Sequence, residues 1–225
     1  IFFYNCAKRL GITKMNEYAS AFGLGQKTGV EIAESAGTLA GPEEREAAGG
    51  VWQSGDTIQA GIGQSDNLFT PLQLSNYCAT VANGGTRYQL HLVQSLIDNS
   101  SGTVNETQPK IEESLDLHKS TLTAVKSGMR LVATQGAPSL IFNQLRTEVA
   151  AKTGTSQVFV NGVKKNNGFL ITFAPYDNPE ISVASVVELA GSGTSTAEIT
   201  SSIIKYWYQN NTDEKTNQKT GALLN

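Results

Sequence analysis

Three β-strand candidates follow one another near the C-terminal end, and they constrain the fold more than any other feature of the sequence. The first covers residues 148–160, and Asn161-Gly162 directly after it is a strong signal for a two-residue hairpin turn. The second covers residues 168–174. The third, residues 181–189, is β-branched and mostly apolar, as expected for a central strand. These segments predict a sheet that contains at least one antiparallel hairpin.

Helical patterns precede and follow these strands. Thr70-Pro71 is a good helix start, because threonine caps helices and proline suits the first helical position. The helix is expected to run over 72–82. Another helix is expected at 121–133, with Leu122, Val125, Met129 and Val132 facing inward. Further helices are predicted at residues 1–10, 14–22 and 196–209.

The remaining segments have weaker patterns. Residues 23–70 are rich in glycine and predict ordered loops, and residues 90–97 predict one more strand. Residues 98–119 form a polar excursion, and residues 210–225 a polar, flexible tail. With 22 glycines and only 16% charged residues, the composition suits a loop-rich α/β or α+β fold.

Composition also argues against several classes of function. The net charge is −3 and no long basic run occurs, so the sequence gives little support to nucleic-acid binding. Cys6 and Cys78, with His91 and His118, have no metal-site spacing, and we expect neither a metal nor another cofactor. Both cysteines are interpreted as small apolar core residues. No run of about 20 apolar residues is present to span a bilayer.

The strongest chemical signal is Lys152-Thr-Gly-Thr-Ser, within the first strand candidate. Such a strand can offer a fixed positive charge, two hydroxyl groups and main-chain N–H donors, while Gly154 lets a substrate approach the backbone. An ordinary edge strand with a solvated lysine is the alternative. A second copy, Lys27-Thr-Gly, precedes no hairpin and is assigned to a structural loop. Gly191-Ser-Gly-Thr-Ser is interpreted as the turn into the last helix.

Several segments in consistent order resemble the penicillin-binding protein transpeptidase domain, closest to its class B (monofunctional) branch. The similar segments are Phe22-Gly-Leu-Gly-Gln-Lys-Thr-Gly, Gly61-Ile-Gly-Gln, Thr70-Pro-Leu-Gln-Leu, Ala82-Asn-Gly-Gly-Thr-Arg-Tyr, Lys152-Thr-Gly-Thr-Ser, Gly168-Phe-Leu-Ile-Thr-Phe-Ala-Pro-Tyr-Asp and Val186-Val-Glu. The resemblance implies an antiparallel sheet flanked by helices, the penicillin-binding and serine β-lactamase-like fold, incomplete in this chain. It implies that residues 1–209 are the C-terminal portion of that domain.

The family carries Ser-x-x-Lys, Ser-x-Asn and Lys-Thr-Gly motifs in chain order, and here only the third has its expected context. Ser202-Ile-Ile-Lys205 lies after Lys152 and is interpreted as a chance match. Ser65-Asp66-Asn67 lies in the loop before the Thr70 helix, and lining the substrate cleft or replacing the missing second motif are the alternatives to a structural role. The resemblance therefore implies that the chain begins just after the second motif and that the nucleophilic serine lies outside it.

By resemblance, Lys152 supports proton transfer and the substrate carboxylate, and the Thr153 and Thr155 hydroxyls bind that carboxylate. The backbone N–H of Thr155 forms half of an oxyanion hole, and Gly154 keeps the strand face open. The implied activity is D,D-transpeptidation of peptidoglycan stem peptides through a serine acyl-enzyme that β-lactams also form. A D,D-carboxypeptidase, a serine β-lactamase, a β-lactam sensor or a non-catalytic binding module remain alternatives.

The resemblance also implies where the protein acts and with what. Its location would be the extracytoplasmic face of a bacterial membrane, with the anchor in a preceding part, and its partners would include the cell-wall synthesis machinery. Because strands of the family's sheet are missing, we expect the chain to need the N-terminal part of the domain, or a complementary or swapped chain, for stability.

Overall fold

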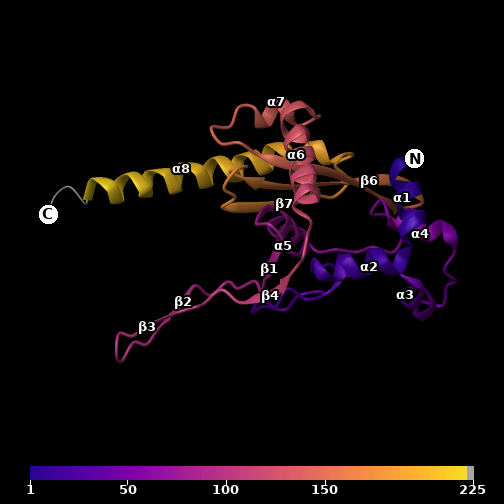
Figure 1. Ribbon diagram of the computed structural model, residues 1–225, viewed down its shortest axis with the longest axis horizontal. Coiled ribbons are helices and arrows are strands. Elements are labelled where there is room, and N and C mark those ends of the chain that lie inside the picture. The colour runs from indigo at the N-terminus through magenta and orange to yellow at the C-terminus, as the bar shows by residue number, and fades with distance from the viewer. Residues whose placement is uncertain (222–225) are drawn as a thin grey trace. The chain divides into compact units, whose positions relative to one another are not determined.

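The computed structural model describes residues 1–221, with side chains through Asn211, and its contacts divide the chain into two compact units. Unit 1 is Ile1–His118 and unit 2 is Lys119–Asn225. Figure 1 shows the elements of both. The boundary after His118 lies inside the stretch 1–209, which the family resemblance assigns to the C-terminal portion of one domain.

Unit 1 contains five helices among its described elements. They are α1 (Phe2–Leu10), α2 (Ile12–Ala21), α3 (Pro42–Ala47), α4 (Ser54–Ala60) and α5 (Pro71–Ala82). Helix α5 begins as the sequence predicts: the Thr70 hydroxyl accepts from the backbone N–H of Gln73, and the Gln73 side chain accepts from the Thr70 N–H. This capping box satisfies N–H groups that a helix start leaves unpaired.

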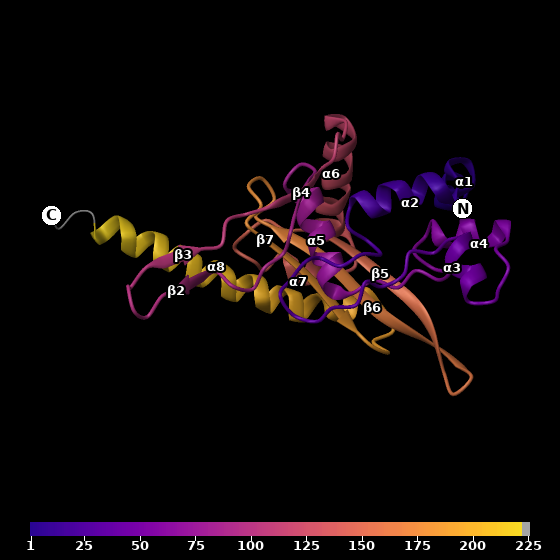
Figure 2. The same ribbon diagram turned by 90° about the horizontal axis from the view of Figure 1, so that it is seen from below.

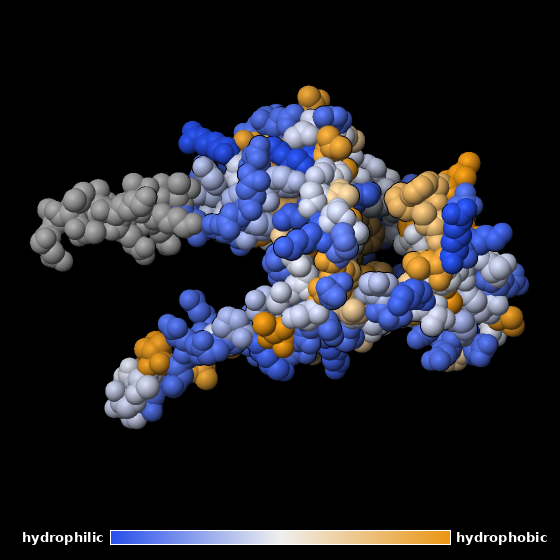
Figure 3. Space-filling model, viewed as in Figure 1, coloured by the Kyte–Doolittle hydropathy of each residue, from blue (hydrophilic) through white to orange (hydrophobic). Residues whose placement is uncertain are grey.

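The two cysteines of unit 1 have different environments. Cys78 of α5 is fully buried, as expected, but Cys6 of α1 is exposed, so its assignment to the core is wrong. In α1 the buried residue is Ala7, and Cys6 points away from it around the helix. Exposed apolar side chains gather at this helix, where Ile1, Phe2 and Phe3 are all at least 66% exposed and colour the surface orange in Figure 3.

Unit 1 also has four short strands, β1 (Thr86–Tyr88), β2 (Ser95–Ile97), β3 (Val104–Glu106) and β4 (Ile111–Ser114). β1 pairs with β4 and β2 with β3, both antiparallel. The β2–β3 pair forms a narrow arm that extends away from the helices of the unit (Figure 1). The strand expected at 90–97 is therefore shorter, and the polar excursion expected at 98–119 contains two strands.

A compact turn joins β2 to β3. The Asp98 carboxylate accepts hydrogen bonds from the hydroxyl and N–H of Ser100 and from the N–H of Ser101. These bonds, led by the one from the Ser100 hydroxyl, lower the pKa of Asp98 to about 2. The polarity of 98–119 thus reflects turns and exposed pairing rather than irregular chain.

Unit 2 is built on a three-stranded antiparallel sheet in the order β5-β6-β7, with β5 at Ala150–Val160, β6 at Val163–Ala174 and β7 at Ile181–Val187. The expected antiparallel sheet is confirmed. Asn161 and Gly162, with φ of 51° and 74°, both adopt the left-handed backbone that a tight hairpin turn requires. Figure 2 shows the long β5–β6 hairpin extending past the rest of the sheet.

Helices cover both faces of this sheet: α6 (Lys119–Gln135), α7 (Ser139–Phe142) and α8 (Ala197–Gly221), with the 3₁₀ turn η1 (Gly193–Thr196). Side chains alternate along the strands, so Ala151, Leu170 and Val183 share one face and form the core with Ala197 and Ile204.

Helix α6 reaches the opposite face, where the Lys126 ammonium lies 5.4 Å from the centre of the Phe173 ring, while its Ala133 belongs to the core around Leu170. Of the residues expected to face inward in α6, Met129 is buried, but Val125 is 46% exposed. The buried part of α6 is centred on Met129 and Ala133, so the inward expectation for Val125 is wrong.

Helix α8 runs beyond residue 209, where the predicted helix ends, and continues to Gly221. Part of the expected tail is therefore helical, and residues 222–225 lie outside the described part of the chain. No helix among the described residues combines the length and the apolar character needed to cross a bilayer.

Candidate functional site

Residues 152–155 lie on β5, which is an edge strand of the sheet in unit 2. Among the described residues, β5 pairs only with β6, so its other edge has no strand partner within this sheet. Lys152 and Thr155 are exposed, and Thr153 and Gly154 are half-buried. The Lys152 ammonium donates to the carbonyl oxygen of Thr153 at 2.6 Å. The cation therefore lies close to the backbone of the same motif.

The pleat of β5 separates the side chains of this motif. Lys152 and Gly154 lie on the face that α6 covers elsewhere along the sheet, whereas Thr153 and Thr155 lie on the face of Leu170. The family resemblance implies that the lysine and the hydroxyls act on one substrate carboxylate. Because the side chains lie on opposite faces of a regular strand, they can contact one ligand only if that ligand lies along the outer edge of the strand.

Glycines bring η1 against the backbone of this motif. A Cβ at Gly193 would lie 2.2 Å from the carbonyl oxygen of Phe169 and 2.6 Å from that of Gly154. A Cβ at Gly168 would lie 2.3 Å from the carbonyl oxygen of Ser192. No side chain fits at either position, and this close packing supports β5 at the middle of the motif. From the sequence, Gly193 is interpreted only as part of a turn, because its position before a helix gives no signal of this contact.

The second Lys-Thr-Gly copy has a different environment. The Glu34 carboxylate accepts hydrogen bonds from the hydroxyl and N–H of Thr28 and from the N–H of Gly29, all at 2.8–2.9 Å. Burial opposes ionisation of Glu34, but these bonds outweigh it, so its pKa is lowered. Thr28 is 5% exposed. These contacts support assigning this copy to a structural loop.

The formal Ser-x-Asn match lies in a polar cluster of unit 1. Arg45 Nε donates to Asp66 Oδ2 at 2.5 Å, and Arg45 Nη2 lies 3.4 Å from Ser65 Oγ. Asn67 accepts from the N–H of Ala40 at 3.0 Å. All three residues of the match therefore hold neighbouring loops together.

The formal Ser-x-x-Lys match lies in the middle of α8. The Ser202 hydroxyl donates to the Glu198 carbonyl oxygen one turn earlier, at 2.9 Å. The Lys205 side chain contributes to a cavity on the surface of unit 2. Among the described contacts, the Ser202 hydroxyl makes no hydrogen bond to Lys205, so nothing pairs it with a base that could activate it as a nucleophile.

The chain is similar to known penicillin-binding proteins in both sequence and structure. The family model of the penicillin binding protein transpeptidase domain matches residues 1–205. Penicillin-binding protein 2A of Bacillus subtilis (strain 168) is 36% identical over 183 residues, covering 76% of this chain and 24% of that protein. Peptidoglycan D,D-transpeptidase MrdA of Escherichia coli (strain K12) is 32% identical over 232 residues, covering 94% of this chain and 36% of that protein.

A solved structure gives the same result for the fold. Pseudomonas aeruginosa PBP2 in complex with WCK 5153 superposes with a TM-score of 0.78 at 28% identity, covering 92% of this chain and 46% of that one. The chain therefore spans about a quarter to a third of the length of these two curated relatives.

Proposed function

The chain belongs to the penicillin-binding protein transpeptidase family, and from this membership we propose that the protein containing it is a peptidoglycan D,D-transpeptidase. Its substrates would be stem peptides ending in D-Ala-D-Ala, and β-lactams would acylate the same serine. The observation that carries the proposal is the Lys152–Thr155 stretch on an edge strand, with Lys152 and Thr155 exposed, within a chain whose family match covers residues 1–205.

Each residue of the motif has a proposed role. Lys152 is the fixed cation that supports proton transfer and attracts the substrate carboxylate. Thr153 and Thr155 bind that carboxylate through their hydroxyls, and the Thr155 N–H stabilises the oxyanion. The nucleophilic serine and its own N–H would come from a part of the protein outside this chain.

The geometry of β5 suits an extended peptide substrate. A peptide that lies along the outer edge can bond to the main chain as an added strand and still reach both faces of β5. Lys152 and the two threonines then contact one ligand from opposite sides of the pleat. At Gly154 no side chain narrows the approach to the strand.

Partners and location follow from the same proposal. The protein would act on the outer side of the bacterial membrane, with its anchor in a part that this chain does not include. There it would work with the cell-wall synthesis machinery. Stem peptides and β-lactams are its proposed ligands.

The test is covalent labelling of the complete protein with a fluorescent penicillin. We expect Lys152→Ala to slow acylation by about 10²-fold or more, because it removes charge that stabilises the transition state. The matched control is Lys164→Ala, which removes an exposed lysine from β6 of the same hairpin and should label at the normal rate. Normal labelling of Lys152→Ala would remove the basis of the proposal.

Ser202→Ala tests whether the nucleophilic serine is Ser202 or a serine outside this chain. If the serine lies outside this chain, Ser202→Ala labels normally, and intact mass after digestion places the adduct in another part of the protein. An adduct on Ser202 would contradict this assignment. Slow release of the bound penicillin is the result expected for a transpeptidase, whereas rapid release of hydrolysed antibiotic would indicate a β-lactamase.

A further inference from the structure

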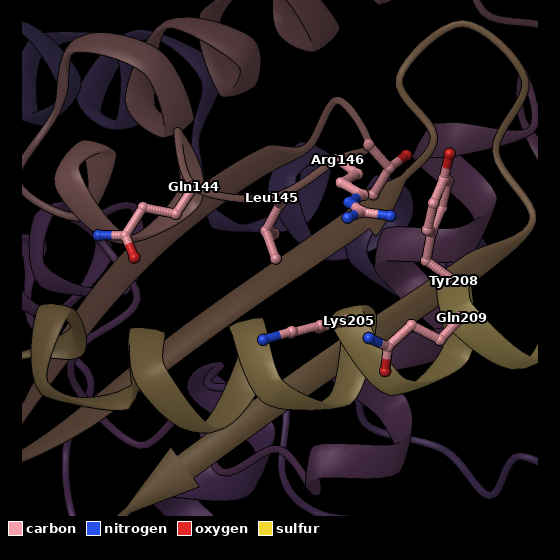
Figure 4. A pocket seen from close by; sticks show the side chains of 7 residues that line it. Gln144, Leu145, Arg146, Lys205, Tyr208 and Gln209 are labelled. Carbon is pink, nitrogen blue, oxygen red and sulfur yellow. The ribbon is translucent and has the colours of Figure 1, made fainter.

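A cavity of about 300 Å³ lies in unit 2 between α8 and the segment that leads into β5. Figure 4 shows Lys205, Tyr208 and Gln209 projecting from α8, with Leu145 and Arg146 across from them. None of these residues belongs to the Lys152–Thr155 site. The volume is at the lower end of the range for small-ligand pockets, so it suits a small molecule or the end of a larger one.

Among the described residues, both charged side chains that line the cavity are cations. Arg146 and Lys205 contribute two cations from different elements, and the other polar lining residues are neutral: Gln144, Thr147, Tyr208 and Gln209. No aspartate or glutamate lines it among the described residues. Within the described part of the chain, neither Arg146 nor Lys205 has an ion pair.

The acidic residue nearest to Arg146 in the sequence pairs with a residue outside the cavity. Glu148 follows Thr147 directly, but its carboxylate bonds to Arg130 of α6 at 2.6 Å. Thr147, 9% exposed, is itself one of the residues that line the cavity. The two cations are therefore left without a neighbouring acidic residue in the described structure.

We propose that this cavity binds a small oxyanion, a carboxylate or a phosphate group, between Arg146 and Lys205. The planar guanidinium of Arg146 is suited to grip two oxygens of one anion, and the Lys205 ammonium adds a point charge from the other side. Neutral donors such as Gln209 can complete the hydrogen bonding. A bound anion would tie α8 to the segment that enters β5, a few residues before Lys152.

Calorimetric titration of the complete protein at low ionic strength tests the proposal. The probes are inorganic phosphate and succinate, which distinguish a phosphate from a carboxylate ligand. The double substitution Arg146→Gln with Lys205→Gln should lower the affinity for the tighter-binding probe at least tenfold. The matched control is Lys164→Gln with Lys165→Gln, which removes the same charge from the exposed β5–β6 hairpin and should leave affinity within twofold.

The outcomes separate clearly. The proposal is supported if either probe binds saturably and the cavity variant loses this binding while the hairpin variant keeps it. The probe that binds more tightly then identifies the ligand class. Equal loss in both double variants would show that net charge alone attracts the anion. No saturable binding of either probe would also overturn it. If the double variant unfolds by circular dichroism, Lys205→Gln alone, at an exposed position, must still weaken binding about threefold or more.

Discussion

Replacing Gly193 with alanine should destabilise unit 2 and impair the site on β5 together. The added Cβ would lie 2.2 Å from the Phe169 carbonyl oxygen, 2.6 Å from the Gly154 carbonyl oxygen and 2.9 Å from the Gly154 nitrogen. All three atoms belong to the backbone of paired strands, so no side chain can rotate away. Either η1 or the β5–β6 pair must move.

Overpacking in a well-packed interior costs about 1–3 kcal/mol, and a clash with three backbone atoms belongs at the upper end. A loss of about 3 kcal/mol lowers the folded-to-unfolded ratio by about two orders of magnitude. Because Gly154 carries two of the three clashing atoms, acylation should slow as well, even under conditions where the variant stays folded.

The assay combines denaturant unfolding of the complete protein, followed by circular dichroism, with penicillin-labelling rates. Gly128→Ala is the matched control, since Gly128 lies in α6 with no atom within 4 Å of the added Cβ. In a helix interior that exchange should stabilise by about 0.5–1 kcal/mol. If Gly193→Ala unfolds within 0.5 kcal/mol of the wild type and labels at the normal rate, the close packing of η1 on β5 is not what supports the site.

Two further predictions test the core and the β2–β3 turn. Leu170→Ala should cost about 2–5 kcal/mol in unfolding free energy, because Leu170 is 1% exposed in the core, while Leu140→Ala, at 81% exposure, should change it by less than about 0.5 kcal/mol. Asp98 should titrate near 2 by carboxyl NMR. Its lowered pKa adds stability above the unfolded pKa of about 3.9 that is lost as the pH falls through 2; titration at the ordinary value would contradict the turn geometry.

The parts of the fold that sequence predicts well are those with local signals. Asn161-Gly162 has the residues that a tight hairpin turn needs, and the strands on either side follow from their β-branched and apolar residues. Thr70-Pro71 and Gln73 likewise define the start of α5 within four residues. In each case, a short segment contains all the chemistry that determines its conformation.

The features that were missed depend on residues far apart in the chain. β3 and β4 are short and exposed, and they form only through pairing with β2 and β1. Cys6 is exposed because the packing of α1 buries Ala7 instead. The contact of Gly193 with β5 arises from tertiary packing alone, which no local pattern reports.

The candidate site was located by its motif, but its arrangement was not. The residue types at 152–155 point to carboxylate binding, yet the order of the letters does not say which side chains share a face. The register of β5 with β6 shows that Lys152 and Thr153 diverge. The proposed common ligand would therefore have to lie along the outer edge of the strand.

The loop around Glu34 offers an internal precedent for the chemistry proposed at the other end of the chain. There, the hydroxyl and amide of Thr28 and the amide of Gly29 already enclose a carboxylate supplied by the protein itself. The Lys27-Thr-Gly copy of the tripeptide thus binds a carboxylate, that of Glu34, which belongs to the same chain. Fragments that imitate this enclosed glutamate give a starting shape for synthetic ligands directed at the exposed copy.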